Sequence, residues 1–246
     1  LGVGRIGDMI TQCTAVAQGS QDVFAGPGLS GGGGGGGGGG FSPAPETPST
    51  PSQPTQTFVI AFGDSITHLY PWVRYALTPL GRTVVTYAKN GRVMKDALKD
   101  WYGNTLTASN FTNCSVVTVY LGINDFGSSN PLGSLSDTKD SNTFTGQVRN
   151  VIETIRSYNS NTKIVFNSLV LSIVGTPAPI GTGFNGYPNI DGSFTLGHND
   201  LGLTQDDYSN RIHDICSSYS SPYVLFNDMR NNSGITGANF NSTIAG

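Results

Sequence analysis

The chain has little charge and few of the residues that usually build metal sites or disulfides. Only 12% of its 246 residues are charged, and its formal net charge is −3. This balance implies no basic surface, so it does not favour nucleic acid as a partner. The three cysteines, Cys13, Cys114 and Cys216, fit no zinc-binding spacing. We interpret them as small buried hydrophobes, with one disulfide as the alternative, and we expect neither a metal nor a cofactor.

Long hydrophobic runs are also absent. A membrane-spanning helix needs about 18 or more consecutive apolar residues, and no run in this sequence approaches that length. We therefore expect no membrane partner. Asn, Ser, Thr and Gly are plentiful, as they are in extracellular and virion-surface proteins. On this composition we expect an extracellular or virion-surface location.

The first 57 residues differ in composition from the rest of the chain. Residues 31–40 are ten consecutive glycines, and residues 41–57 are rich in Pro, Ser and Thr. Such segments bury little and lose much backbone entropy when they are ordered, so residues 31–57 are interpreted as a linker. Residues 1–30 are interpreted as the end of an upstream module or an N-terminal segment. The alternative is that polyglycine packs in an ordered assembly, so residues 1–57 could mediate homo-oligomer or virion assembly.

From residue 58 the pattern alternates between strands and helices. Apolar, β-branched runs predict five strands, at Phe58–Phe62, Thr83–Tyr87, Ser115–Leu121, Lys163–Leu169 and Tyr223–Asn227. Helices are expected between them, at residues 70–79, Met94–Tyr102, Phe144–Tyr158 and Thr204–Ser217, with Thr204 as an N-cap. This alternation indicates an α/β protein with a five-stranded parallel sheet covered on both faces.

Three short motifs follow the first three predicted strands. The first strand ends at Gly63-Asp64-Ser65, the second at Lys89-Asn90-Gly91, and the third at Gly122-Ile123-Asn124-Asp125. Each could be only a turn: Gly-Asp-Ser often caps a helix, and Asn-Gly is a common tight turn. Ligand sites of parallel sheets lie at the carboxyl ends of the strands, so we expect the three motifs to meet at one edge.

These residue types suit nucleophilic attack on a carbonyl group. Ser65, on an exposed turn, could attack a carbonyl carbon. The resulting oxyanion needs two or three fixed donors, and the Ser65 N–H, the Gly91 N–H and the Asn124 side-chain amide could provide them. A glycine at position 91 would let a substrate approach the backbone closely.

The ordered set "FGDS", "NG" and "GIND" resembles the SGNH/GDSL hydrolases, which are serine esterases and acylhydrolases. The resemblance covers residues 58–246, and the stretch after "GIND" is similar to a bacterial and phage branch of that family. It implies a flavodoxin-like, three-layer α/β/α sandwich. It also implies that Ser65 is the nucleophile and that Gly91 and Asn124 are oxyanion-hole donors.

One block of the family is missing from this sequence. Its members carry Asp-x-x-His near the C-terminus, which provides the general base and its orienting acid. None of the three histidines, His68, His198 and His213, has an aspartate three residues before it. We therefore expect the domain to be C-terminally incomplete, and the chain as written to be a poor esterase.

Two functions are compatible with these features. The first is an esterase that removes acyl groups, acetyl above all, from a glycan through a Ser65 acyl-enzyme. The loop aromatics Phe184, Tyr187 and Phe194 could stack on sugar rings, or they could form a small loop core. The second is a non-catalytic carbohydrate- or receptor-binding or structural module of a virion or extracellular assembly.

Overall fold

The structure is a computed structural model that describes residues 58–169, 187–188, 194–195 and 198–232. The predictions for residues 1–30 and for the linker 31–57 lie outside the described residues. The same is true of the chain that follows residue 232. The aromatic residue Phe184 also lies outside them.

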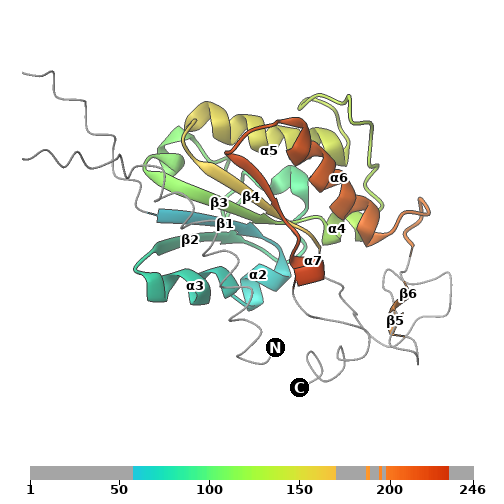
Figure 1. Cartoon of the computed structure of the whole chain (residues 1–246), viewed down its shortest axis with the longest axis horizontal. Helices are drawn as coiled ribbons and strands as arrows, with labels where there is room; N and C mark the ends of the chain where they lie inside the picture. Colours follow the sequence, from blue (N-terminus) through green and yellow to red (C-terminus); the bar gives the residue numbers. More distant parts are fainter. Residues whose placement is uncertain (1–57, 170–186, 189–193, 196–197, 233–246) are drawn as a thin grey trace, which may run out of the picture.

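A single parallel sheet forms the centre of the domain (Figure 1). Its strands are β1 (Phe58–Gly63), β2 (Thr83–Ala88), β3 (Cys114–Tyr120), β4 (Lys163–Asn167) and β7 (Val224–Asn227). They lie in the order β2-β1-β3-β4-β7, and every neighbouring pair is parallel. In chain order this is 2-1-3-4-5, the flavodoxin-like arrangement. The predicted five-stranded parallel sheet is confirmed, and each predicted strand lies within a few residues of its observed position.

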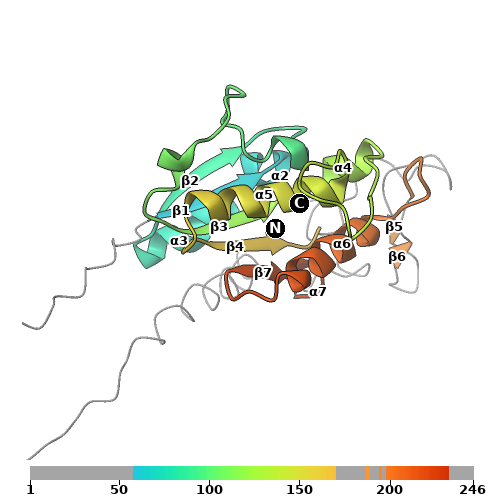
Figure 2. The ribbon, with the colours of Figure 1, turned by 90° about the horizontal axis from the view of Figure 1, so that it is seen from above.

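Helices cover both faces of the sheet, so the domain has three layers (Figures 1 and 2). Alternate residues of β1 are buried on opposite faces of the sheet. Ile60 and Phe62 are buried in the larger core, whereas Val59 and Ala61 are buried in the smaller one. This alternation is the two-residue period of a strand that is covered on both faces.

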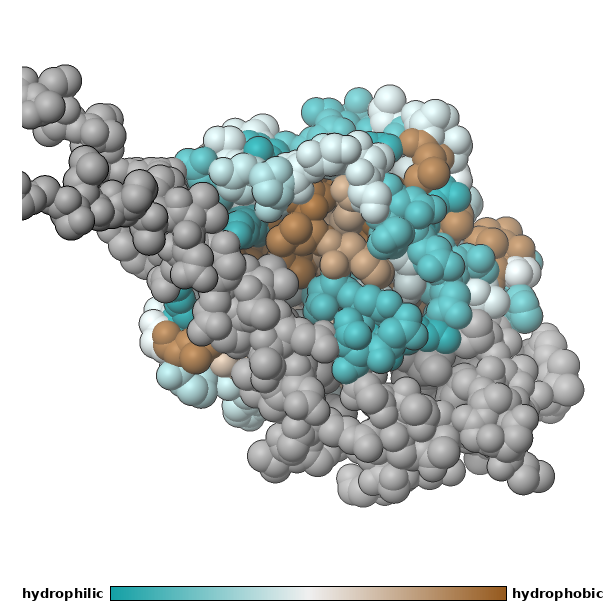
Figure 3. Space-filling model, viewed as in Figure 1, coloured by the Kyte–Doolittle hydropathy of each residue, from teal (hydrophilic) through white to brown (hydrophobic). Residues whose placement is uncertain are grey.

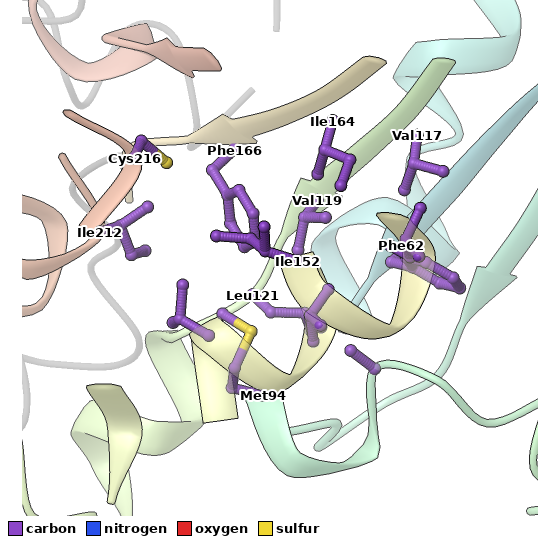
Figure 4. Close-up of a cluster of buried hydrophobic side chains, with 14 of the residues drawn as sticks. Phe62, Met94, Val117, Val119, Leu121, Ile152, Ile164, Phe166, Ile212 and Cys216 are labelled. Atoms are coloured by element: carbon purple, nitrogen blue, oxygen red, sulfur yellow. The ribbon is translucent and has the colours of Figure 1, made fainter. Parts of the chain in front are cut away.

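The larger core lies under helices α5 (Phe144–Tyr158) and α6 (Gln205–Ser218). Figure 4 shows Ile152 of α5 and Ile212 of α6 beside Phe166 of the sheet. The smaller core lies under α2 (Ser65–Leu69) and α3 (Trp72–Leu77) and includes Met229 of the short helix α7 (Met229–Asn232), while the 3₁₀ turn Thr78–Leu80 after α3 is exposed. The three-layer sandwich predicted from the sequence is confirmed.

The two long helices begin where the sequence predicts. Helix α5 has the predicted bounds, and the hydroxyl of its N-cap Thr143 accepts a hydrogen bond from the N–H of Gly146 at 3.2 Å. Thr204 is the N-cap of α6, as predicted, and forms a reciprocal capping box with Asp207. Such a box satisfies two backbone donors that the helix itself cannot bond.

The predicted helix Met94–Tyr102 is wrong. Only a 3₁₀ turn forms there, at Met94–Asp96, and the chain then folds into a hairpin in which Lys99 pairs with Thr105. A second 3₁₀ turn, at Ala108–Phe111, precedes β3. The remaining elements are the short helix α4 (Ile123–Gly127) and an antiparallel pair, β5 (Tyr187–Pro188) and β6 (Phe194–Thr195).

The described cysteines agree with the interpretation from the sequence. Cys114 and Cys216 are both free and buried, so they pack as small hydrophobic side chains. Cys13 lies outside the described residues. No helix in the described part of the chain is long and apolar enough to cross a membrane. On the face seen in Figure 3, hydrophilic residues cover much of the described surface and hydrophobic residues form separate patches.

Candidate active site

Ser65 lies on the turn that connects β1 to α2. The strand ends at Gly63, Asp64 is the N-cap, and Ser65 is the first helical residue. One carboxylate oxygen of Asp64 accepts a hydrogen bond from the Ile66 N–H at 2.9 Å. Asp64 is fully buried while Ser65 is partly exposed. The cap therefore fixes the backbone of the turn and leaves the serine accessible.

Gly63 allows this turn to be tight. A Cβ atom at position 63 would lie 2.2 Å from the hydroxyl oxygen of Thr67 and 2.3 Å from its Cβ. Both distances are far shorter than any ordinary contact between non-bonded atoms, so no larger residue fits without moving the helix. The first residue of the Gly-Asp-Ser motif thus lets α2 fold back against the end of β1.

The register of the sheet brings the three predicted motifs to one edge. Gly63 of β1 pairs with Ala88 of β2 on one side and with Tyr120 of β3 on the other. The N–H of Lys89 also donates a hydrogen bond to the carbonyl of Gly63, at 3.2 Å. The connections after β1 and β3 leave toward opposite faces of the sheet, because α2 covers one face and α5 the other. In open α/β sheets this switch point is where a crevice for a ligand forms.

Gly91 and Asn124 lie in the segments that follow β2 and β3. Gly91 is exposed, has φ of +73°, and has no atom within 4 Å of a would-be Cβ. Asn124 lies in the first turn of α4, and its side-chain amide donates a hydrogen bond to the carbonyl of Arg92 at 3.0 Å. A side-chain amide has two N–H donors, so one remains for a ligand after this bond.

Asp125 also binds the segment that follows Gly91. One of its carboxylate oxygens accepts a hydrogen bond from the Met94 N–H at 2.8 Å, and the other accepts one from the Asn130 amide at 2.9 Å. The Asn130 amide also donates to Gln147 of α5. The Asn-Asp pair of the third motif therefore holds the chain that follows Gly91 through two adjacent side chains.

The two buried aspartates of the motifs are electrostatically unusual. The pKa of Asp64 is raised from 3.8 to about 6, mainly by burial and in smaller part by the charge of Asp125, against the opposing effect of its hydrogen bond from Ile66. Burial also raises the pKa of Asp125 to about 6, against the opposing effect of its hydrogen bond from Asn130. The second carboxylate oxygen of Asp64 has no hydrogen-bond partner among the described residues. Ionising either group costs free energy that the fold must supply.

Arg92 is buried and acts as a structural connector. Its guanidinium donates hydrogen bonds to three backbone carbonyls, those of Tyr87 (2.9 Å), Lys99 (2.8 Å) and Asp100 (2.8 Å). Burial lowers its pKa, while the nearby carboxylates of Asp96 and Asp100 oppose that shift. Its side chain therefore holds the 99–100 segment against the end of β2.

The three histidines lie in different environments. The ring of His68, one turn after Ser65 in α2, lies 4.8 Å from the ring of Trp101. His213 is exposed in α6, as predicted, and its ring contacts Asp214 and Phe226. His198 is exposed in a loop, also as predicted. No hydrogen bond joins any of them to Ser65 within the described part of the chain.

The structure thus brings the predicted residues Ser65, Gly91 and Asn124 to the ends of neighbouring strands, and their catalytic roles remain a prediction. Sequence reasoning missed the supporting roles of Asp64, Arg92 and Asp125. Asp64 and Asp125 had a signal, because each is an acidic residue next to a predicted site residue at the end of a buried strand. Arg92 had only its place directly after Gly91.

Two further expectations from the sequence concern metal ions and the loop aromatics. Among residues 58–169 and the later described segments, no group of three His, Cys, Asp or Glu side chains could hold a metal ion. The side chains of the loop aromatics Tyr187 and Phe194 lie outside the description, although their backbones form β5 and β6. Their predicted contact with sugar rings is therefore not tested.

Comparison with known proteins identifies the family. Residues 61–240 match the GDSL-like Lipase/Acylhydrolase family. This is most of the chain, so the protein belongs to that family, and the resemblance drawn from "FGDS", "NG" and "GIND" is confirmed. Membership places the domain among the ester hydrolases.

The chain also resembles solved structures. The chain is 21% identical to a protein from Lactobacillus plantarum, with a TM-score of 0.53 over 75% of this chain and 82% of that one. It is also 21% identical to a possible lipase from Chitinophaga pinensis, with a TM-score of 0.49 over 70% of this chain and 67% of that one. At such identity the first likeness shows the fold alone. A comparison with curated proteins found no match.

Proposed function

We propose that this protein is a serine esterase that removes acyl groups, above all acetyl, from a glycan, with Ser65 as the nucleophile. One observation supports this most. Ser65 starts the helix after β1, while Gly91 and Asn124 follow the two strands that pair with β1 on either side. The proposed nucleophile and both proposed donors therefore lie around the switch point of the sheet, where open α/β sheets bind ligands.

The reaction follows from these positions. The hydroxyl oxygen of Ser65 attacks the carbonyl carbon of the ester, and the carbonyl electron pair moves to its oxygen. The N–H groups of Ser65 and Gly91 and the free N–H of the Asn124 amide stabilise that oxyanion. Its collapse breaks the bond to the sugar oxygen, which takes up the proton that the Ser65 hydroxyl has lost and leaves as the sugar hydroxyl, while the acyl group remains on Ser65. Water then releases the carboxylic acid.

The fixed geometry of the donors favours this role over simple binding. Asn124 is held by its bond to Arg92, and the segment after Gly91 is held by the bond between Asp125 and Met94. Donors that are already in place need no reorganisation when the oxyanion forms, which is the condition for a large catalytic effect.

The glycan substrate and the location belong to the same proposal. The composition, rich in Asn, Ser, Thr and Gly, supports an extracellular or virion-surface location, where glycans are accessible. Residues 1–57 are proposed to tether the domain or to join it to an assembly. The alternative function is a non-catalytic glycan-binding or structural module, which is favoured by the lack of a histidine bonded to Ser65 among the described residues.

The decisive experiment measures acetate release from partly acetylated oligosaccharides by the full chain and by Ser65→Ala. Because none of its histidines has the family's preceding aspartate, we expect slow release by the wild-type chain and its loss in the variant, with thermal unfolding unchanged. A fluorophosphonate should add its mass to Ser65 in the intact protein and not to the variant. The variants His68→Ala, His198→Ala and His213→Ala then show whether one of these histidines is the general base.

Two results would contradict the esterase. Acetate release that survives in Ser65→Ala would remove Ser65 as the nucleophile. Oligosaccharide binding that is equal in both proteins, with neither hydrolysis nor labelling of Ser65, would instead support the binding module.

A further inference from the structure

An aromatic hairpin lies beside the proposed active site. We call residues 98–106 the Trp101 hairpin. Its two strands are joined by the Lys99–Thr105 pairing and by a hydrogen bond from the Leu106 N–H to the Leu98 carbonyl at 2.9 Å. Trp101 and Tyr102 lie at its tip, where 47% of Trp101 and 87% of Tyr102 are exposed. Two adjacent, largely exposed aromatic rings form a surface of the kind that often binds ligands.

The tip of the hairpin contacts the helix that carries Ser65. The Trp101 ring lies 4.8 Å from the His68 ring, with 41° between their planes. His68 is three residues after Ser65 in α2, and residues at this spacing are neighbours on a helix surface, with Cβ atoms about 5–6 Å apart. The Trp101 indole therefore contacts a residue, His68, that lies one helical turn from Ser65.

Arg92 fixes the hairpin relative to the proposed oxyanion hole. Its guanidinium binds the carbonyls of Lys99 and Asp100, the two residues before Trp101. Its own carbonyl accepts the hydrogen bond from Asn124. One buried residue thus connects the aromatic tip with Gly91 and Asn124, so the distance between them is set by the fold.

The ionisable side chains of the hairpin are engaged within it or next to it. Lys99 forms an ion pair with Asp96 at 2.6 Å. The carboxylate of Asp100 accepts hydrogen bonds from the backbone N–H and the side-chain amide of Asn104, at 2.8 and 2.9 Å. The hairpin therefore presents flat aromatic surface at its tip without directing its own charges there. This suits a neutral ligand better than an anionic one.

We propose that the Trp101 hairpin binds a neutral pyranose ring of the substrate, with the ring stacked on Trp101 and bordered by Tyr102. This inference rests on the proposed function and names the part of the substrate that the same site recognises. Stacking would place an acylated hydroxyl of the sugar over the turn that bears Ser65. Trp101 and Tyr102 would then determine specificity without taking part in the chemistry.

A sugar fits this surface better than a fatty acyl chain does. A long acyl chain is bound best in an enclosed aliphatic channel, where its whole surface leaves water. Here the rings are open to solvent on one side and have polar neighbours such as Asn104. A pyranose ring has an apolar C–H face that can lie on an indole, while its hydroxyls remain in water.

The test compares sugar and non-sugar esters in variants of the full chain. Trp101→Ala should raise KM about tenfold for partly acetylated xylo-, manno- or chito-oligosaccharides, a change equal to about 1.4 kcal/mol, which is near the upper end of what an aromatic contact contributes. Its kcat/KM for ethyl acetate, which has no ring, should stay within about twofold. Trp101→Phe should keep most of the affinity. Tyr75→Ala, which removes an exposed aromatic of α3, is the matched control and should change the kinetic constants for neither substrate.

A binding measurement separates failure of this inference from failure of the esterase. The chain has two tryptophans, Trp72, which is buried, and Trp101, which is accessible to acrylamide. Deacetylated oligosaccharide should protect the fluorescence of Ser65→Ala from acrylamide, and this protection should weaken in Ser65→Ala/Tyr102→Ala, which keeps the Trp101 reporter. Protection without hydrolysis by the wild type would keep the sugar surface and overturn the esterase. Hydrolysis with no protection by any of the three oligosaccharides, or equal losses on sugar and ethyl esters, would overturn the sugar surface.

Discussion

The side-chain amide of Asn124 binds the backbone carbonyl of Arg92, at 3.0 Å. Arg92 directly follows Gly91, so this bond joins the segments that carry the two proposed donors outside the Ser65 turn. The amide is restrained in orientation by the bond, and its second N–H is left for a ligand. We therefore propose that Asn124 both shapes the oxyanion hole and contributes a donor to it.

Replacing Asn124 with Ala should lower kcat by about 10²–10³, the usual effect of losing one oxyanion-hole donor. Because the donor acts on the transition state, KM for a small ester should change little. The measurement is steady-state hydrolysis of ethyl acetate, with thermal unfolding recorded in parallel. Asn161→Ala, at an exposed asparagine just before β4, is the control. An unchanged kcat in a folded Asn124→Ala protein would remove Asn124 from the site.

The buried carboxyls of Asp64 and Asp125 should make stability depend on pH. Their folded-state pKa values, about 6, lie above the ordinary value of 3.8. The native state therefore binds more protons than the unfolded state between about pH 4 and 6. The free energy of unfolding should decrease as the pH rises through that interval, by at most about 3 kcal/mol for each group.

The variant Asp64→Asn tests this directly, because Asn is also a good N-cap and keeps the bond to Ile66. Urea unfolding at pH 4, 5, 6 and 7 should show a flatter pH dependence in Asp64→Asn and in Asp125→Asn than in the wild type. The exposed residue Asp140, changed to Asn, should leave the curve unchanged. A wild-type protein that gains stability from pH 4 to 6 would contradict the raised pKa values.

Gly63→Ala should destabilise the domain and reduce labelling of Ser65. The added methyl group would lie 2.2 Å from the Thr67 hydroxyl oxygen, so α2 must move away from the end of β1. Overpacking of this kind typically costs about 1–3 kcal/mol. Urea unfolding and fluorophosphonate labelling are the two measurements. Ser65→Ala, which adds no atoms to the same turn, should unfold like the wild type; if Gly63→Ala does so as well, the close contact with Thr67 is not a constraint.

Cys114 and Cys216 should be unreactive while the protein is folded. Both are buried, and burial raises the pKa of each thiol to about 12. Since the thiolate is the reacting form, a thiol reagent should modify neither cysteine in native Cys13→Ser protein and both in urea. The measurement is a count of titrated thiols with and without denaturant. Rapid modification of the native protein would show that one of the two sites opens.

Elements with a strong period were predictable from the sequence, whereas those shaped by distant contacts were not. Helix α5 has a continuous apolar stripe, Val148, Val151, Ile152 and Ile155, and its bounds were predicted correctly. The segment Met94–Tyr102 has a similar local pattern, with Met94 and Ala97 buried. There, however, the Arg92 guanidinium takes the carbonyls of Lys99 and Asp100, and Gly103, with φ of +94°, reverses the chain.

The candidate site was predictable only in part for the same reason. Motifs at strand ends identify Ser65, Gly91 and Asn124, because strand ends can be read from local composition. The supporting hydrogen bonds, between Asp125 and Met94 and between Arg92 and Lys99, join residues that no local sequence pattern relates. Burial of Asp64 and Asp125 was also hidden, since acidic residues after a strand usually mark an exposed turn.

The order of the strands bears on how such a domain could diversify. β1 lies between β2 and β3 in the sheet, and these are the first three strands of the domain, so residues 58–125 carry the proposed nucleophile, both proposed donors and the Trp101 hairpin. A recombination event that exchanged this one stretch of gene would transfer the acyl-binding chemistry and its recognition surface together. Insertions in the connection between β4 and β7 would lengthen that connection without disturbing residues 58–125.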